Sequence, residues 1–363
     1  MLLVALGACR GGGDAIVVGL AGPFSDPRGV SMRLAADLAI EEINGAGGVR
    51  GRPLALRVVD DSADAEVAVR VARDLVVDPA VVAVIGHLTS STTIAAAPIY
   101  NGRERPVVAV SPSASNPDIR TLGPYTFRAC PHDLVHGTRL ARWAQERLGA
   151  RRAAVLYLND DYGRGMRAAF SQSFTALGGT VVADDPYLVT MESFEPYLSR
   201  LRALGGVDVL MIAGSRAGAE RIIATLDSID LDPVILGGDG LTGIERSPVD
   251  AEGVYISEAY LPDRPGQRNE TFVAAYRAAY GDRPLDHRGA TTYDIVYLLA
   301  RAIEEAGTDR EAIREYLAGV GTETPPFEGV TGRIAFDEDG DVPAKDVVIG
   351  VVRAGRIVTA PGQ

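Results

Sequence analysis

Two short segments rich in hydroxyl side chains are the part of this sequence best suited to hold a ligand. Residues 85–92 (IGHLTSST) and residues 111–116 (SPSASN) each follow a run of β-branched residues that we predict to be a buried strand. In a parallel sheet both segments lie at the carboxyl edge, where ligands bind in this architecture. Backbone N–H groups and hydroxyls at a helix N-terminus favour an anion such as a carboxylate. One segment alone would indicate helix capping, but two adjacent segments favour a carboxylate-binding site.

Other candidate chemistries have weaker support in the sequence. The chain contains no G-x-x-x-x-G-K-[ST] motif, no G-x-S-x-G motif and no visible pairing of a nucleophile with a base, so we expect no enzyme and no cofactor, dinucleotides included. His132 and His136 could share a helix face, but no third ligand accompanies them, and we interpret them as part of a solvated first helical turn. Residues 337–341 (DEDGD) resemble a calcium loop, but no glutamate closes it, so we predict a hairpin turn.

The composition excludes several classes of protein. The chain has 363 residues, 47% hydrophobic and 23% charged, which is typical of a folded protein of about two domains. The net charge of −12 would repel phosphate backbones and anionic lipid headgroups, so we expect no nucleic-acid partner and no membrane-surface partner. No apolar run after residue 10 reaches the ~20 residues of a spanning helix.

Strands and helices in alternation must position the two hydroxyl-rich segments. The first run predicts strands over residues 15–19, 54–59, 81–86 and 106–110, with helices over 30–44, 63–77 and 91–100. The second run predicts strands over 153–157, 180–183, 207–212 and 233–236, with helices over 163–177, 194–204 and 217–226. Each run indicates right-handed βαβ units and a parallel sheet.

The last third of the chain has a different pattern. It predicts helices over residues 271–280, 291–306 and 310–318, followed by a hairpin between residues 333–337 and 347–352. Three consecutive helices cannot extend the second sheet by themselves. We therefore expect them to cover the first sheet, which requires the chain to cross between the lobes more than once.

Residues 85–100 (IGHLTSSTTIAAAPIY) resemble a block of the leucine/isoleucine/valine-binding protein family, the type I periplasmic substrate-binding proteins of ABC importers. The resemblance extends over residues 16–358 and includes Gly22-Pro23, Ile43-Asn44 with Gly47-Gly48, residues 111–117 (SPSASNP), residues 161–165 (DYGRG) and residues 238–240 (GDG). It implies an α/β protein of the type I periplasmic binding protein fold, in which three hinge crossings join two doubly wound parallel-sheet lobes. The expected lobe 1 comprises residues 15–130 plus 260–335, and the expected lobe 2 comprises residues 131–259 plus 336–363.

The resemblance also implies a role for particular residues in holding an amino acid or amino-acid-like ligand between the lobes. Ser90 and Ser115 would hold the ligand α-carboxylate through hydroxyls and backbone N–H groups, and Ser113 would contribute mainly its backbone. Asp239 would take the α-ammonium as a charge-assisted partner. Tyr162 would close over the ligand.

The side-chain pocket departs from the family pattern. Arg288 aligns with an aromatic wall of the apolar pocket, and a second pocket aromatic falls at Ser215 or Arg216. An unpaired guanidinium in a closed cleft is costly to desolvate. Either the ligand brings an acidic or strongly hydrogen-bonding group, or Arg288 pairs with Asp286 or Asp294. The first alternative predicts a polar or acidic ligand in preference to leucine.

The N-terminus indicates the compartment. Residues 6–9 (LGAC) resemble the lipobox of bacterial lipoproteins, which predicts acylation of Cys9, and we interpret residues 1–14 as a truncated lipoprotein signal with a glycine-rich tether. The protein would then be extracytoplasmic, anchored by lipid alone, and Cys130 would be a small buried thiol. We expect a monomer whose partner is an ABC permease. The alternative is a ligand-sensing regulator or receptor module with the same fold.

Overall fold

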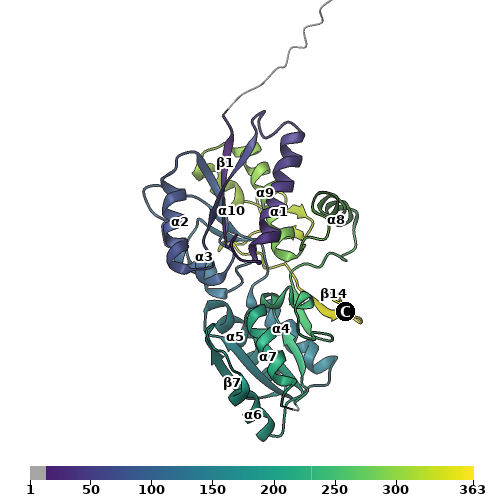
Figure 1. Cartoon of the computed structure of the whole chain (residues 1–363). Coiled ribbons are helices and arrows are strands. Elements are labelled where there is room, and N and C mark those ends of the chain that lie inside the picture. Colours follow the sequence, from purple (N-terminus) through teal and green to yellow (C-terminus); the bar gives the residue numbers. More distant parts are fainter. Residues whose placement is uncertain (1–13, 230) are drawn as a thin grey trace, which may run out of the picture.

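A five-stranded parallel sheet forms the centre of the first lobe. The computed structural model describes residues 14–229 and 231–363, and its two lobes lie end to end in Figure 1. The first sheet has the order β2-β1-β3-β4-β5. Its strands are β1 (Ile16–Gly22), β2 (Leu54–Asp60), β3 (Val81–Ile85), β4 (Ala109–Ser111) and β5 (Thr126–Arg128). Every residue of β3 is buried because helices cover both faces of the sheet.

Five of the described helices cover the two faces of the first sheet, and a sixth packs outside them. One face packs against α1 (Gly29–Gly45), α9 (His287–Ala306) and α10 (Arg310–Ala318), and the other packs against α2 (Ala65–Val77) and α3 (Ser90–Tyr100). The sixth helix, α8 (Gln267–Tyr280), packs on α1 through Phe272 and Tyr276. Of the three predicted C-terminal helices, α9 and α10 therefore cover the first sheet as predicted, whereas α8 lies outside them against α1.

A seven-stranded mixed sheet forms the second lobe, with the order β14-β13-β10-β9-β8-β6-β7. Its strands are β6 (Arg152–Leu158), β7 (Thr180–Tyr187), β8 (Val209–Ala213), β9 (Val234–Gly237), β10 (Tyr255–Glu258), β13 (Val348–Arg353) and β14 (Arg356–Thr359). Helices α4 (Asp133–Glu146) and α5 (Asp161–Ala176) cover one face, and α6 (Glu195–Ala203) and α7 (Arg216–Leu226) cover the other. These helices lie in the lower lobe of Figure 1.

The C-terminal strands pair differently from the sequence prediction. Strand β12 (Gly332–Ile334) forms its hairpin with β11 (Phe327–Gly329), and β13 pairs antiparallel with β10 and β14, so the predicted hairpin between residues 333–337 and 347–352 is wrong. The physical reason is a side-chain cap: the Asp294 carboxylate accepts hydrogen bonds from the backbone N–H groups of Val330 and Thr331, at 2.7 and 2.9 Å, and so closes the tight turn of the earlier hairpin.

The chain crosses between the two sheets three times. It leaves the first sheet after β5, returns after β10 and leaves again after Val342, which with Phe336 still packs in the core of the first lobe. The alternating α/β architecture with parallel-dominated sheets confirms the predicted fold class. Among the described residues, no helix has both the length and the apolar character that a bilayer span requires.

Polar caps start the helices whose first turns face the junction of the lobes. Thr89 caps α3 by accepting from the backbone N–H of Thr92, at 3.3 Å. Asp160 caps α5. Asp286 caps α9 by accepting from the N–H groups of residues 288 and 289, at 3.0 and 3.3 Å. The Asp286 cap starts α9 at His287, four residues before the predicted start, and this places two charged side chains in its first turn.

Candidate functional site

The two hydroxyl-rich segments lie side by side at the carboxyl edge of the first sheet. The Ser90 hydroxyl accepts a hydrogen bond from the backbone N–H of Asn116, at 3.2 Å, and so links the start of α3 to the segment after β4. Ser90 and Ser115 are 2% and 0% exposed. The Ser115 hydroxyl lies beside the Asp133 carboxyl group but forms no well-aligned hydrogen bond with any described residue. Because Thr89 supplies the helix cap, capping does not account for either serine.

This edge meets the second lobe at the start of α5. The Asn116 side-chain amide donates to the backbone carbonyl of Asp161, at 2.6 Å, and the Ser91 hydroxyl accepts from the N–H of Asp161, at 3.4 Å. Next to this contact, the Tyr162 hydroxyl accepts from the N–H of Gly240, at 3.0 Å. A Cβ at Gly240 would lie 2.7 Å from the Tyr162 ring, so the close approach requires glycine there.

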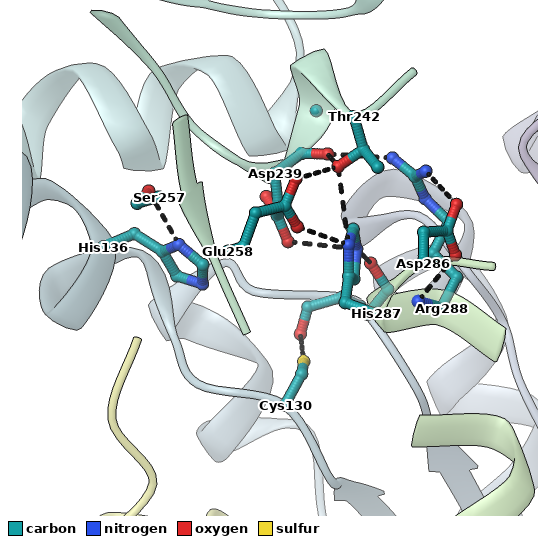
Figure 2. Close-up of polar contacts among 12 residues, drawn as sticks. Cys130, His136, Asp239, Thr242, Ser257, Glu258, Asp286, His287 and Arg288 are labelled. Atoms are coloured by element: carbon teal, nitrogen blue, oxygen red, sulfur yellow. Dashed lines mark hydrogen bonds and ion pairs between the residues drawn. The ribbon is translucent and has the colours of Figure 1, made fainter. Parts of the chain in front are cut away.

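A buried cluster of charged side chains joins the lobes, as Figure 2 shows. His287, in the first turn of α9, contacts the Glu258 carboxylate through Nδ1 at 2.8 Å and the Asp239 carboxylate through Nε2 at 3.5 Å. The Arg288 guanidinium donates to the Asp286 carboxylate at 3.1 Å and to the backbone carbonyl of Asp239 at 2.9 Å. Charges of both signs are therefore paired across the junction of the two lobes.

Burial and pairing compete in setting the protonation of this cluster. Burial lowers the pKa of His287, and Arg288 lowers it too, but the carboxylates of Glu258 and Asp239 outweigh both and raise it. Burial raises the pKa of Glu258, and His287 offsets part of that rise. Burial also raises the pKa of Asp286, but Arg288 and His287 outweigh it, so the net shift is downward. The surroundings of His287 and Asp286 therefore favour the charged form of each, and Arg288 is paired with Asp286.

The contacts of Arg288 decide between the two alternatives that the sequence left open. The guanidinium pairs with Asp286, whereas Asp294 caps the β11–β12 turn. Since Asp286 compensates the buried charge, Arg288 does not require an acidic group on the ligand. The reasoning that led from Arg288 to an acidic ligand therefore loses its premise.

Ser215 and Arg216 serve their own helix. The Ser215 hydroxyl caps α7 by accepting from the N–H of Gly218 at 3.4 Å, and Arg216 pairs with Glu220 one turn later, also at 3.4 Å. The Arg216 side chain also lies close to Gly243, in the segment that follows Asp239. These two residues therefore border the charged cluster with their side chains engaged elsewhere.

Sequence reasoning missed several polar residues of this junction. Asp133, in the first turn of α4, is 0% exposed, and neither carboxylate oxygen has a hydrogen-bond partner among the described residues. Burial raises the pKa of Asp133 to about 8. Its carboxylate lies against α5, where a Cβ at Gly165 would be 2.2 Å from Oδ2. The glycines of residues 161–165 (DYGRG) were the sequence signal for this contact, because a residue without a side chain leaves room for a buried neighbour.

The two predicted histidines of α4 differ from the expectation of a solvated turn. His136 is 0% exposed, and its Nδ1 contacts the Ser257 hydroxyl at 2.9 Å, because the helix presses that face onto β10. His132 is half-buried. Within residues 14–229 and 231–363, no group of three or more His, Cys, Asp or Glu side chains has an arrangement that could hold a metal ion.

Two acidic or glycine-rich segments have structural roles. Residues 337–341 form a turn in which the Gly340 N–H donates to the Asp337 carbonyl at 3.1 Å, and Asp341 pairs with the buried Arg128. It is not the predicted hairpin turn, because the strands before and after it pair with other strands. Residues 238–243 (GDGLTG) match the glycine spacing of the dinucleotide fingerprint G-x-G-x-x-G, which the expectation of no dinucleotide cofactor did not take into account. They form two short 3-10 turns and open no α-helix, so the helix N-terminus that would hold a pyrophosphate is missing there.

Comparison with known proteins identifies a family. A family model described as "Periplasmic binding protein" matches residues 15–356. A leucine-, isoleucine-, valine-, threonine- and alanine-binding protein of Pseudomonas aeruginosa is 30% identical over 343 residues, covering 93% of this chain and 89% of that protein. An ABC transporter substrate-binding protein of Desulfitobacterium hafniense, solved with leucine, has a TM-score of 0.83 and 31% identity, covering 96% of this chain and 100% of that one. LivJ of Streptococcus pneumoniae, solved with isoleucine, has a TM-score of 0.84 and 26% identity, covering 94% and 97%.

Proposed function

The chain belongs to the periplasmic binding protein family, and from that premise we propose that it is the extracytoplasmic substrate-binding protein of an ABC importer, which captures an amino acid or amino-acid-like ligand between its two lobes by hinge closure. The family consists of substrate-binding proteins of transporters, so the protein is not an enzyme. Its working partner would be an ABC permease that receives the closed, loaded form.

The observation that supports this proposal most directly is the set of contacts between lobes around the proposed ligand residues. Asn116 and His287 of the first lobe reach Asp161, Glu258 and Asp239 of the second. All of them lie where the carboxyl ends of the two sheets face each other, and only a closed arrangement of the lobes can form these contacts. A ligand held there would bias the hinge toward the closed state.

We assign the ligand groups as follows. Ser90 and Ser115, with the backbone N–H groups at the start of α3, would hold the α-carboxylate. The α-ammonium would lie against the Asp239 carboxylate, and Tyr162 would cover the ligand from the second lobe. The Ser115 hydroxyl supports this assignment, since it is buried beside the Asp133 carboxyl group without a well-formed hydrogen bond, and a ligand oxygen could satisfy it.

The remaining expectations are also part of the proposal. Lobe 1 would comprise residues 15–130 plus 260–335, lobe 2 residues 131–259 plus 336–363, and the protein would work as a monomer. Cys9 would bear the lipid anchor; it lies outside the residues that the structure describes. Metabolic labelling with a fatty-acid analogue should label the wild-type chain and not Cys9→Ala. Light scattering of the purified protein should give the mass of one chain.

The proposed function is tested by native mass spectrometry of the purified protein, followed by calorimetry with the twenty amino acids. We expect a copurified or added amino acid to bind at one site per chain. Binding of no amino acid would refute the proposal.

A further inference from the structure

Each ring nitrogen of His287 faces a different set of groups. Nδ1 faces the Glu258 carboxylate at 2.8 Å and the Thr242 hydroxyl at 3.4 Å. Nε2 faces the Ser113 hydroxyl at 3.2 Å and the Asp239 carboxylate at 3.5 Å. The His287 side chain is 0% exposed. Nδ1 is thus directed toward Glu258 at the end of β10 in the second lobe, whereas Nε2 is directed toward Ser113 and Asp239 of the proposed ligand site. Figure 2 shows His287 among Glu258, Asp239 and Thr242.

The environment of Nδ1 determines the protonation of the ring. The Glu258 carboxylate accepts a hydrogen bond from the Thr242 hydroxyl at 2.6 Å, which fixes its position beside Nδ1. The Glu258 carboxylate, 2.8 Å from Nδ1, favours a proton on that nitrogen by its charge, although the two atoms do not form a hydrogen bond, and Nε2 is the ring nitrogen that faces away from Glu258. Asp239 favours a proton on Nε2 as well.

The N–H of Nε2 is only loosely engaged by the protein. Its two contacts, 3.2 Å to Ser113 and 3.5 Å to Asp239, are longer than the about 2.9 Å of a well-formed N–H···O hydrogen bond. An acceptor oxygen of a ligand placed between these two residues can therefore replace them as the partner of Nε2. An aliphatic side chain at the same place would leave the donor without a partner, which is costly in a closed site.

The charges that face His287 favour a neutral acceptor. On its own helix Arg288 and Asp286 balance each other, and the second lobe presents the carboxylates of Asp239 and Glu258. His287 therefore faces two acidic side chains, and burial raises the pKa of one of them, Glu258. The α-ammonium of an amino acid would lie against Asp239, and an additional side-chain carboxylate would add another acidic group to this buried cluster.

We propose that His287 is a specificity-determining residue whose Nε2–H selects an amino acid with a neutral acceptor oxygen in its side chain, an amide carbonyl or a hydroxyl. The inference rests on the proposed function, because it takes an α-ammonium at Asp239 as given. Glu258 and Thr242 are positioning residues that orient the ring.

Calorimetry on the full chain, freed of bound ligand, with glutamine, asparagine, threonine, glutamate and leucine tests the inference. We expect at least one of the three neutral acceptor ligands to bind at least tenfold more tightly than leucine, equal to about 1.4 kcal/mol, and more tightly than glutamate. In His287→Phe the affinity for that ligand should fall at least tenfold while the affinity for leucine does not fall. His132→Phe, a matched substitution outside the site, should leave both affinities unchanged.

A second variant covers the case in which His287→Phe does not fold, as judged by circular dichroism. Glu258→Gln removes the carboxylate that raises the pKa of His287, so the ring should lose its proton at a lower pH than in the wild type. Affinity for the acceptor ligand should then decline at a correspondingly lower pH. A purely structural role for Glu258 would change the affinity without moving this pH profile, and would overturn the assignment.

The outcomes separate this inference from the proposed function. Tightest binding of leucine by the wild type, with acceptor-ligand affinity unaffected in His287→Phe, would overturn the inference and leave the proposed function intact. Binding of no amino acid would overturn both.

Discussion

Removal of the Asp239 carboxylate is the most direct perturbation of ligand capture. The main-chain carbonyl of Asp239 accepts from Arg288 at 2.9 Å and from the Thr242 hydroxyl at 2.6 Å, and a substitution of the side chain leaves both bonds in place. Asp239→Asn also preserves the shape of a residue that is only 3% exposed. The substitution therefore isolates the contribution of the negative charge.

The magnitude follows from the burial of that charge. Hydrogen bonds to charged groups contribute about 1.5–3 kcal/mol, and each 1.4 kcal/mol is tenfold in affinity, so Asp239→Asn should weaken ligand binding by a factor of about 10 to 150. His287 keeps its contact with Glu258 at 2.8 Å, so the imidazolium remains in place and does not lie uncompensated.

Isothermal titration calorimetry with the ligand identified by mass spectrometry gives the affinity of each variant. Asp184→Asn is the matched control, because Asp184 pairs with Arg167 on the surface of the second lobe, away from the proposed site. Circular dichroism establishes that both variants fold. An affinity for Asp239→Asn within twofold of the wild type would refute the assignment of the α-ammonium to this carboxylate.

Three further predictions concern the carboxylate site, the hinge and the stability of the fold. Ser90→Ala and Ser115→Ala should each weaken ligand binding less than Asp239→Asn does, because backbone N–H groups remain at both positions; calorimetry showing a larger loss would contradict this. Saturating ligand should reduce the radius of gyration measured by small-angle scattering, and identical scattering with and without ligand would exclude hinge closure. Asp341→Asn should lower the free energy of unfolding in urea by about 3–5 kcal/mol, because it leaves the 1%-exposed Arg128 without its carboxylate, and a loss below about 1 kcal/mol would refute a structural role for the pair. Burial raises the pKa of Asp341, but Arg128 outweighs burial, so the pKa of the folded state lies below that of the unfolded state. The stabilisation by this pair is therefore present above the unfolded pKa and is lost as the pH falls through the folded pKa. Acid titration of unfolding should detect this loss in the wild type and not in Asp341→Asn.

The repeating order of strands and helices was predictable because it depends on local periodicity. Buried parallel strands read as apolar β-branched runs, and their covering helices read as amphipathic stretches, so the two sheets and the return of the C-terminal helices to the first lobe followed from the sequence. Strands β5, β10, β11 and β14 and helix α4 were missed. The four strands are three or four residues long, and α4 buries His136 where the pattern indicated a solvated turn.

The hydroxyl-rich segments could be recognised from the sequence, because their serines and threonines come directly after the ends of predicted strands. The partners of the charged residues could not be predicted, since they depend on which distant segments the fold places together. Arg288 had two carboxylates near it in sequence, and the capping conformation of Asp286 decided between them, while Asp294 closes a turn 36 residues away.

His287 and Glu258 illustrate the same limit more strongly. They lie in different lobes, and each would be an isolated polar residue on an apolar helix or strand if judged by sequence. Their 2.8 Å contact exists only because the chain crosses between the sheets and brings the start of α9 against the end of β10. Local sequence therefore determined the elements and the position of the hydroxyl-rich edge, and the tertiary structure decided the charge pairing there, because burial and proximity between distant segments set both the cost and the partner of each charge.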